Sequence, residues 1–579
     1  MSRKGSLALS DYLPAFERPG EPFLHYYSFP QEGAVAETEC TRGEFWTLSR
    51  KAATALTEGG CGKGHCFALC FGANQYLDLA FRLAAAMTGT IPVTINWQAD
   101  PVARVVHKIR LTECRLILTD GCFPRETLGE IQRTLPELAV FSIEDVRGLP
   151  PLPEDEFCGD LNEEATKIII FTSGTTGEPK GAQLPYRCYR TNRATFESFL
   201  AVSPDCRFAT VVVNPLHHTN STAVTDWALR RPGTHLHLME RYSTPYWRIL
   251  VQAVAKGYER MAAPLVSRHF DFLEGLIESG RLPVELTALK DALGKVDVLI
   301  GSAPVGPTTV KRFLRLSART PRVRFGSTET CLQVLGVPHH LSEEAKQKAF
   351  ERGWSHEHGG ERKVGYYVGR PHPPYTEARI VKSTTPGDPG YMQDCEPGEP
   401  GFLLTRGDNL MSGYVKDPEA TAEVFRDGWY NGLGDVCFAL RSPEDNEPDY
   451  YWMSRTSSLL VRGGANYSGA QIAGELKDFV TTHYGLPGDA FEIAVVGLKV
   501  ESEHEDSCCV AIELLSEVAR DKRRAIEDTF LEEAPRHVSK GARPDHLRFM
   551  PIPRNFKGAV LVEVLKEAYL EILESGPEP

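Results

Sequence analysis

Residues 167–181, KIIIFTSGTTGEPKG, constrain the fold and the chemistry of this chain more than any other stretch. A short apolar run, residues 168–171, leads into a loop of small hydroxyl residues and glycines that closes on Lys180. Glycines let the main chain approach an anion, hydroxyl and backbone N–H groups donate to its oxygens, and lysine supplies positive charge. An ordinary surface loop is the alternative, but hydroxyls, glycines and lysine are too dense here to favour it. We predict a phosphate-binding loop formed by Thr172, Ser173, Gly174, Thr175, Thr176, Gly177 and Lys180.

This loop is not a Walker A motif, because no Gly-Lys-Ser/Thr sequence follows a four-residue spacer, and a P-loop NTPase is therefore disfavoured. The chain has 579 residues, which predicts more than one domain. Its net charge of −13 argues against nucleic acid or an anionic membrane as the main partner. Fourteen cysteines without a CxxC pair favour a reduced compartment. Without a signal-like segment or a long apolar run, no transmembrane segment is expected and a cytoplasmic location is the default.

Strand-like and helix-like segments alternate along the N-terminal part of the chain. Residues 65–71 have the pattern of a buried strand, and residues 91–95 and 115–120 have that of two more. Between the first two, Leu77, Ala80, Phe81 and Ala84 form one apolar helix face that stops near Gly89. This order predicts an α/β fold in which helices cover a largely parallel sheet.

Four further motifs follow the phosphate loop. In residues 209–222, a buried strand ends at Pro215 and is followed by His217 and His218, which in isolation are more often a hydrogen-bonded loop feature than a catalytic one. Residues 301–305, GSAPV, follow another apolar strand, and residues 324–330, RFGSTET, come next. In residues 428–438, GWYNGLGDVCF, the carboxylate of Asp435 is suited to accept from two neighbouring ribose hydroxyls.

These motifs, in this order, resemble those of the ANL adenylate-forming superfamily, which contains acyl-CoA synthetases, peptide-synthetase adenylation domains and beetle luciferases. The resemblance implies that Phe325 stacks on adenine, that Thr328 contacts the α-phosphate and that Glu329 binds Mg²⁺ as a hard oxygen ligand. It further implies nucleotide contacts from Gly301, Ser302, Ala303, Pro304, Gly326, Ser327, Asp435 and Arg455. It places His217 and His218 beside the acyl substrate.

The resemblance also implies two domains, a large one of layered, mostly parallel sheets with helices over residues 1–454 and a small mobile α+β lid over residues 455–579. The hinge would lie near residues 455–458, where Thr456, Ser457 and Ser458 replace the usual aspartate or lysine. The tail, PIPRNFKGAVLVEVLKEA, departs from the common family pattern, which would place the catalytic lysine at Ala559. A second form of the family ends this loop in Phe-Lys, which makes Lys557 the candidate. A solvated loop lysine is the alternative.

The implied activity is that of a stand-alone acyl-CoA synthetase, an AMP-forming acid–thiol ligase. A carboxylate attacks Mg·ATP to give acyl-AMP and pyrophosphate, and coenzyme A then takes the acyl group. Alternatives are an acyl-AMP ligase that loads a separate carrier protein or stops at the adenylate, and a degenerate homologue that binds nucleotide or acyl group without turnover. The Phe-Lys tail favours a medium- or long-chain fatty acid as substrate, with aryl acids open.

Overall fold

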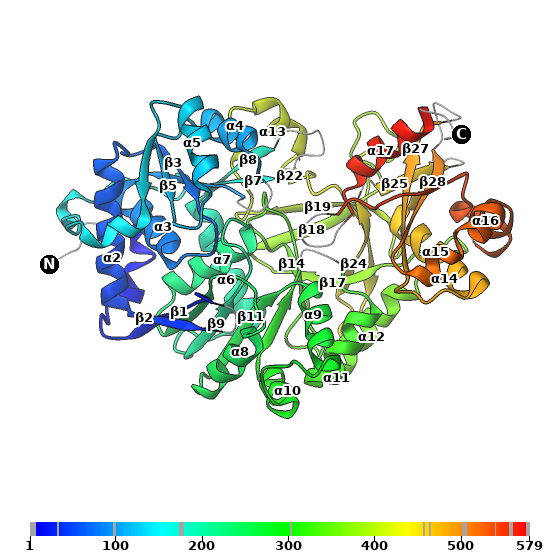
Figure 1. Ribbon diagram of the computed structural model, residues 1–579, viewed down its shortest axis with the longest axis horizontal. Helices are drawn as coiled ribbons and strands as arrows, with labels where there is room; N and C mark the ends of the chain where they lie inside the picture. The colour runs from blue at the N-terminus through cyan, green and yellow to red at the C-terminus, as the bar shows by residue number, and fades with distance from the viewer. Residues whose placement is uncertain are drawn as a thin grey trace.

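The computed structural model describes residues 7–31, 34–96, 100–172, 179–301, 304–455, 458–462, 465–500, 506–538, 540–554 and 560–574. Figure 1 shows a large N-terminal body and, at the right, a smaller C-terminal part drawn in orange and red. The body is a mixed α/β structure and the C-terminal part is a small α+β unit, as the sequence predicts.

One sheet of the body contains the phosphate-loop strand. Its strands β7, β4, β3, β5 and β6 are parallel, and β8 and β20 extend it in antiparallel fashion. Because β3 and β5 are buried on both faces, they read as apolar runs rather than as alternating patterns. In spatial order the strands are β20 (Gly413–Tyr414), β8 (Lys180–Pro185), β7 (Thr166–Thr172), β4 (Ile91–Thr94), β3 (Cys66–Cys70), β5 (Leu116–Thr119) and β6 (Ala139–Ser142).

A second, longer sheet carries the other motifs. Its strands from β1 through β10, β9, β11 and β12 to β13 are parallel, and the remaining strands are antiparallel. In spatial order they are β2 (Ala36–Thr41), β1 (Pro22–Ser28), β10 (Thr234–Met239), β9 (Phe208–Val212), β11 (Arg260–Leu265), β12 (Asp297–Ile300), β13 (Arg322–Phe325), β14 (Leu335–Gly336), β17 (Tyr366–Pro371), β24 (Pro448–Arg455), β23 (Asp435–Arg441), β19 (Gly401–Gly407), β22 (Trp429–Tyr430) and β21 (Phe425–Arg426), with β18 (Thr376–Val381) paired to β19. A separate hairpin joins β15 (Glu357–His358) to β16 (Glu361–Arg362).

Helices cover these sheets (Figure 1). The helix predicted from Leu77 onward is α3 (Tyr76–Thr88), and it ends where Gly89 adopts a left-handed conformation with φ 75°. All of its residues are buried rather than one face alone, because α2 and β4 both pack against it. The helices of the body are α1 (Leu7–Ser10), α2 (Arg42–Glu58), α3, α4 (Val102–Thr112), α5 (Arg125–Thr134), α6 (Tyr186–Leu200), α7 (Thr219–Arg230), α8 (Tyr246–Ala255), α9 (Ser267–Glu278), α10 (Leu286–Lys295), α11 (Pro307–Ser317), α12 (Glu343–Trp354) and α13 (Pro418–Val424).

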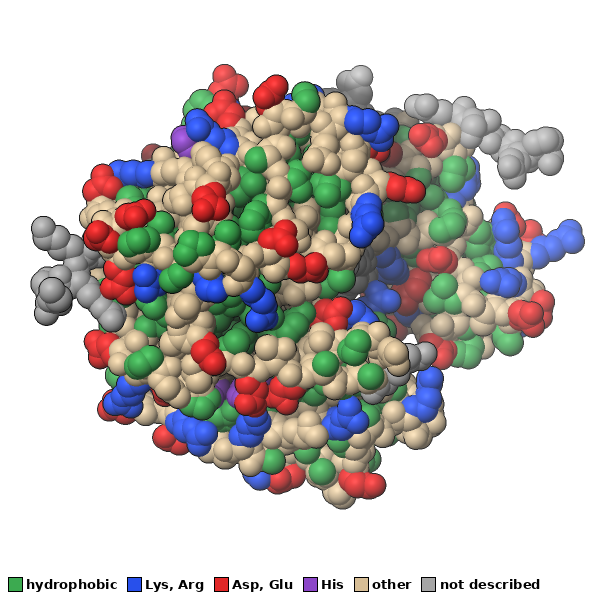
Figure 2. All heavy atoms as spheres, turned by 60° about the vertical axis from the view of Figure 1, so that its left-hand side comes forward, with side chains coloured by type: hydrophobic (Ala, Val, Ile, Leu, Met, Phe, Trp, Pro, Cys, Tyr) green, Lys and Arg blue, Asp and Glu red, His purple; other side chains and the backbone are tan. Residues whose placement is uncertain are grey.

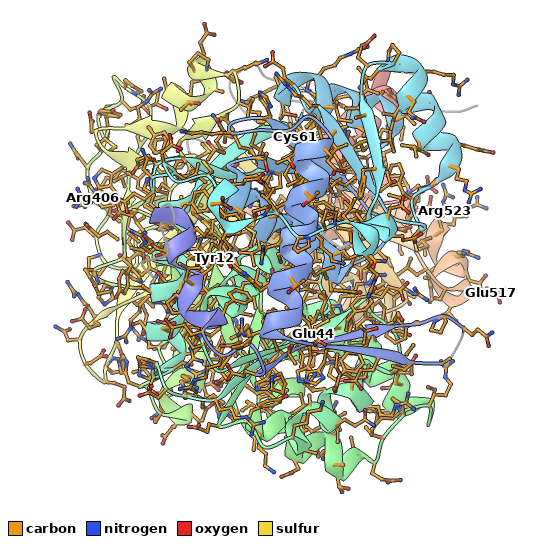
Figure 3. All side chains as sticks on the ribbon, turned by 90° about the vertical axis from the view of Figure 1, so that its left-hand side faces the viewer. Tyr12, Glu44, Cys61, Arg406, Glu517 and Arg523 are labelled. Atoms are coloured by element: carbon orange, nitrogen blue, oxygen red, sulfur yellow. The ribbon has the colours of Figure 1, made fainter. Side chains whose placement is uncertain are left out.

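A buried polar cluster fastens the phosphate-loop strand to α7. The carboxylate of Asp226 accepts a hydrogen bond from Tyr12 Oη at 2.6 Å and pairs with Lys167 Nζ at 3.0 Å and with Arg230 Nε at 2.7 Å. Burial lowers the pKa of Lys167 to about 8. Figure 3 shows Tyr12 on the N-terminal segment beside α2; Glu44 lies in the first turn of α2, and Cys61 lies just beyond its end. Through Asp226, the start of β7 is therefore linked both to α7 and to the N-terminal segment.

The C-terminal part has its own buried apolar clusters, formed by residues between 460 and 573. Its sheet joins β27 (Phe491–Leu498), β28 (Ser507–Leu514) and β29 (His546–Phe549), and a hairpin joins β25 (Leu459–Arg462) to β26 (Ala465–Ser468). Its helices are α14 (Gly469–Tyr484), α15 (Glu517–Asp521), α16 (Arg523–His537) and α17 (Val562–Glu574). Figure 2 shows a hollow between this part and the body. Across the described ranges of the chain, no helix combines the length and apolarity needed to cross a membrane.

Candidate active site

The strands β7 and β8 present the two ends of the predicted phosphate loop to each other. Thr172, the last residue of β7, pairs with Lys180, the first residue of β8, and Thr172 Oγ1 donates to the Lys180 carbonyl at 3.4 Å. Both side chains are half-buried. The loop between them, with Ser173, Gly174, Thr175, Thr176 and Gly177, lies outside the described residues, so its contacts with phosphate stay a prediction.

Tyr414 links the phosphate loop to the motif that contains Glu329. Tyr414 belongs to β20, which pairs with β8, and the Lys180 ammonium lies 5.4 Å from the centre of the Tyr414 ring. Tyr414 Oη donates to Glu329 Oε1 at 3.2 Å. Burial and the Glu329 carboxylate together raise the pKa of Tyr414, so the phenol stays protonated as a donor. Sequence reasoning missed Tyr414, because a tyrosine after a short loop carries no periodic signal.

Glu329 is nearly buried, with 9% of its surface exposed. The N–H of Met411, in the segment before β20, donates to its carbonyl at 2.8 Å, which fixes the backbone beneath the carboxylate. A carboxylate held in place by one phenol keeps further lone pairs for a hard cation. Its free lone pairs suit the Glu329 carboxylate to supply one oxygen ligand to Mg²⁺.

The histidine loop and the adenine motif meet at a pair of threonines. Thr219 Oγ1 donates to Thr328 Oγ1 at 2.9 Å, and Thr219 is the first residue of α7. The preceding His218 is half-buried, His217 is buried, and their ring centres are 4.2 Å apart. His218 thus immediately precedes the threonine that contacts Thr328, the candidate α-phosphate contact.

Glycines allow close backbone packing around the predicted adenine site. A Cβ at Gly326 would lie 1.7 Å from the Leu332 carbonyl oxygen, and one at Gly301 would lie 3.0 Å from the Arg324 carbonyl oxygen. Phe325 is half-buried at the end of β13, followed by half-buried Ser327. Pro304 is exposed, whereas Ser302 and Ala303 lie outside the described residues. Stacking on adenine stays a prediction.

Arg324 precedes Phe325 and is buried, with no acidic partner among the residues that the structure describes. Its Nη2 donates to Asn220 Oδ1 at 2.8 Å, on α7 next to Thr219. Its Nε and Nη1 have no hydrogen-bond partner among the described residues. Burial lowers the pKa of Arg324 to about 9. An uncompensated guanidinium at such a place is costly, which makes it a candidate functional residue that its sequence position alone did not reveal.

Asp435 and Arg455 lie together at the end of the body nearest the C-terminal part. They are paired residues of β23 and β24, and Arg455 Nε lies 3.5 Å from Asp435 Oδ1, which also accepts from Trp452 Nε1 at 2.7 Å. Burial raises the pKa of Asp435, and Arg455 offsets part of that rise. Arg455 is the first residue of the predicted hinge, residues 455–458, of which Ser458 is also described, and its exposed side chain suits contact with a ligand. Lys557 lies outside the described residues.

A family model of AMP-binding enzymes matches residues 15–415. The chain therefore belongs to the AMP-binding enzymes, which are the ANL adenylate-forming family that the motifs predicted. Among its relatives, an indoleacetate–CoA ligase of Aromatoleum aromaticum is 25% identical, over 90% of this chain and 95% of the relative. The long-chain-fatty-acid–CoA ligase FadD13 of Mycobacterium tuberculosis is 24% identical, over 95% and 96% of the two chains.

The fold matches that of solved structures. The O-succinylbenzoate coenzyme A synthetase of Bacillus subtilis, solved in complex with ATP and magnesium ion, superimposes with a TM-score of 0.69. The match covers 96% of this chain and 99% of that one at 21% identity. The similarity thus extends over the body and the C-terminal part together.

Proposed function

We propose that this protein activates a carboxylic acid with ATP and transfers the acyl group to coenzyme A. The observation that carries the proposal is the continuous set of contacts from Lys180 through Tyr414 to Glu329, which ends beside Thr328 and the histidine loop. Such a row of a cation, a phenol, a carboxylate and hydroxyls suits a magnesium triphosphate lying across the edges of both sheets. Family membership and the acid–CoA ligases among the relatives support the same activity.

In the proposed first step, a carboxylate oxygen attacks the α-phosphorus, and the bond from that phosphorus to the bridging oxygen of pyrophosphate breaks. In the second step the sulfur of coenzyme A attacks the acyl carbon, AMP leaves, and the thiol proton passes to solvent. Bound Mg²⁺ would neutralise phosphate charge, with Glu329 as its ligand. Asp435 and Arg455 would hold the ribose, and residues 455–458 would act as the hinge of the lid domain. Lys557 would stabilise charge at the α-phosphate.

Pyrophosphate exchange with a panel of carboxylic acids tests this proposal. We expect exchange with at least one acid, and a loss of about tenfold or more in Lys557→Ala, because that ammonium would stabilise the transition state. Lys499→Ala, which removes an exposed lysine of the same C-terminal part, is the control and should exchange as the wild type does. Undiminished exchange by Lys557→Ala would contradict its catalytic role.

The remaining outcomes separate the alternatives. Exchange without thioester formation on adding coenzyme A would favour a carrier-protein acceptor or an enzyme that stops at the adenylate. No exchange with any acid would favour a degenerate homologue that binds nucleotide or acyl group without turnover. In that case equilibrium binding of ATP would still be measurable.

Two classes of carboxylic acid are candidates for the substrate. The Phe-Lys tail favours a medium- or long-chain fatty acid, and this tail lies outside the described residues. Arg324 favours an acid with a second anionic group, because such a group would pair with a buried guanidinium that has no acidic partner in the described part of the chain. Asn220 and Thr219 place this guanidinium beside the histidine loop, where the acyl group is expected.

A substitution at Arg324 distinguishes the two acids. If a dianionic acid is the substrate, Arg324→Met should lower its kcat/KM about 10–100-fold, because a charged hydrogen-bonded pair is lost, while the KM for ATP stays unchanged. The melting temperature should not fall, since the change removes a buried charge that no acid among the described residues neutralises. Arg324→Lys, which keeps the charge, is the matched control. A wild type that activates palmitate or hexanoate but neither succinate nor sulfoacetate would contradict the dianionic substrate.

A further inference from the structure

A pocket lies at the opposite ends of the strands that lead to the candidate active site. Arg260, Asp297 and Arg322 are the first residues of the parallel strands β11, β12 and β13. The candidate active-site residue Gly301 follows β12, and Phe325 is the last residue of β13. The two sites therefore lie at opposite ends of these parallel strands. In Figure 1, α8 and α10, which border this pocket, lie at the lower edge of the molecule.

Three arginines converge on one buried carboxylate in this pocket. Asp297 is 4% exposed; its Oδ1 accepts from Arg319 Nη2 and from Arg322 Nε, both at 2.9 Å. Its Oδ2 accepts from Arg260 Nη2 at 2.6 Å. The Arg322 side chain is nine-tenths buried, and its Nη1 has no hydrogen-bond partner within the described part of the chain. One carboxylate therefore orients three guanidinium groups that it cannot neutralise.

The charge on the pocket wall is net positive, which suits an anion. Four basic and two acidic side chains line the pocket, which leaves an excess of two positive charges; they are Arg260, Lys295, Arg319, Arg322, Glu259 and Asp297. Glu259 is engaged elsewhere, since its Oε1 accepts from the Arg207 N–H at 3.0 Å. Arginine N–H groups held in fixed directions match the oxygens of a phosphate group.

The rest of the wall is apolar. Tyr258, Val254 and Met261 line the pocket beside the arginines. Its volume is 610 Å³, within the range of small-molecule sites. We propose that this pocket binds a small phosphate monoester, with its phosphate on Arg319 and Arg322 and its organic part against Tyr258. The site is separate from the ATP site and does not depend on the proposed activity.

Calorimetric titration of the full chain with phenyl phosphate and with inorganic phosphate, at fixed ionic strength, tests this site. We expect one phenyl phosphate to bind with a dissociation constant on the order of 1 mM, and inorganic phosphate to bind more weakly because it lacks the ring. Arg319→Gln should weaken the binding of phenyl phosphate about tenfold. Lys180→Gln should leave the affinity for phenyl phosphate unchanged, which would exclude the phosphate loop as the site that binds this ligand.

Two further variants keep the test decisive. Lys295→Gln removes a mostly exposed lysine of the pocket wall, so the fold is retained, and it should weaken binding several-fold. Arg315→Gln on α11, which pairs with Glu274 outside the pocket, is the matched control and should bind as the wild type. The proposal would be overturned if phenyl phosphate did not bind the wild type. It would also be overturned if Arg319→Gln and Lys295→Gln both bound phenyl phosphate as tightly as the wild type does.

Discussion

Glu329→Gln is expected to lower the rate of pyrophosphate exchange by about 10²–10³-fold without unfolding the protein. Glutamine has nearly the shape of glutamate and its amide oxygen still accepts from Tyr414 Oη, which now donates to the carboxylate at 3.2 Å. It lacks the negative charge that a magnesium ion requires of an oxygen ligand. The expected loss is therefore one of metal binding and catalysis, whereas the melting temperature should stay close to that of the wild type.

Exchange rates measured over a range of Mg²⁺ concentrations check this expectation. The variant should need more Mg²⁺ for its half-maximal rate, which a defect in folding alone would not produce. Glu377→Gln on β18 is a matched control, since Glu377 is exposed and pairs with Arg406, a residue marked in Figure 3. A Glu329→Gln enzyme with normal exchange at limiting Mg²⁺ would show that another group binds the metal.

Gly326→Ala is expected to lower the free energy of unfolding by at least about 3 kcal/mol, which is a large part of the stability of an ordinary domain. A Cβ at this position would lie 1.7 Å from the carbonyl oxygen of Leu332. That oxygen belongs to the backbone, so rotation of a side chain does not relieve the overlap. The turn of residues 326–332 would have to open, and with it the positions of Thr328 and Glu329.

Thermal unfolding and ATP binding by the purified variant measure this loss. Gly275→Ala in α9 is the matched control, because a Cβ there meets no atom within 4 Å. Alanine also favours a helix over glycine, so this control should be as stable as the wild type or slightly more stable. If Gly326→Ala melts at the same temperature as the wild type, the close approach to Leu332 is not rigid.

Much of the site was predictable because its residues are contiguous in sequence. The strand before the phosphate loop, the small residues after β12 and the motif after β13 are each short local patterns, and the family they indicate is confirmed. Helix α3 was also predicted, since its apolar spacing and Gly89 are local signals. Its complete burial was not, because that depends on packing between α2 and β4.

Other features depend on strand pairing across long sequence separations. Tyr414 reaches Glu329 only because β20 pairs with β8, and a sequence gives no register for such a pair. Arg324 is visible in the sequence, but the absence of an acid around it among the described residues appears only in three dimensions. The interpretation of Ser173–Gly177 and Lys557 still rests on the sequence alone.

The pairing of β20 with β8 also has a consequence for biosynthesis. Residues 413–414 form the outer edge of the sheet whose other strands are complete by residue 185. Until the ribosome has added more than two hundred further residues, the backbone of β8 has no neighbour on that side in this sheet. An unpaired edge strand is a template for association with other chains. The edge of β8 is therefore open to association with other chains for much of the synthesis, until β20, the last strand of this sheet to be made, pairs with it.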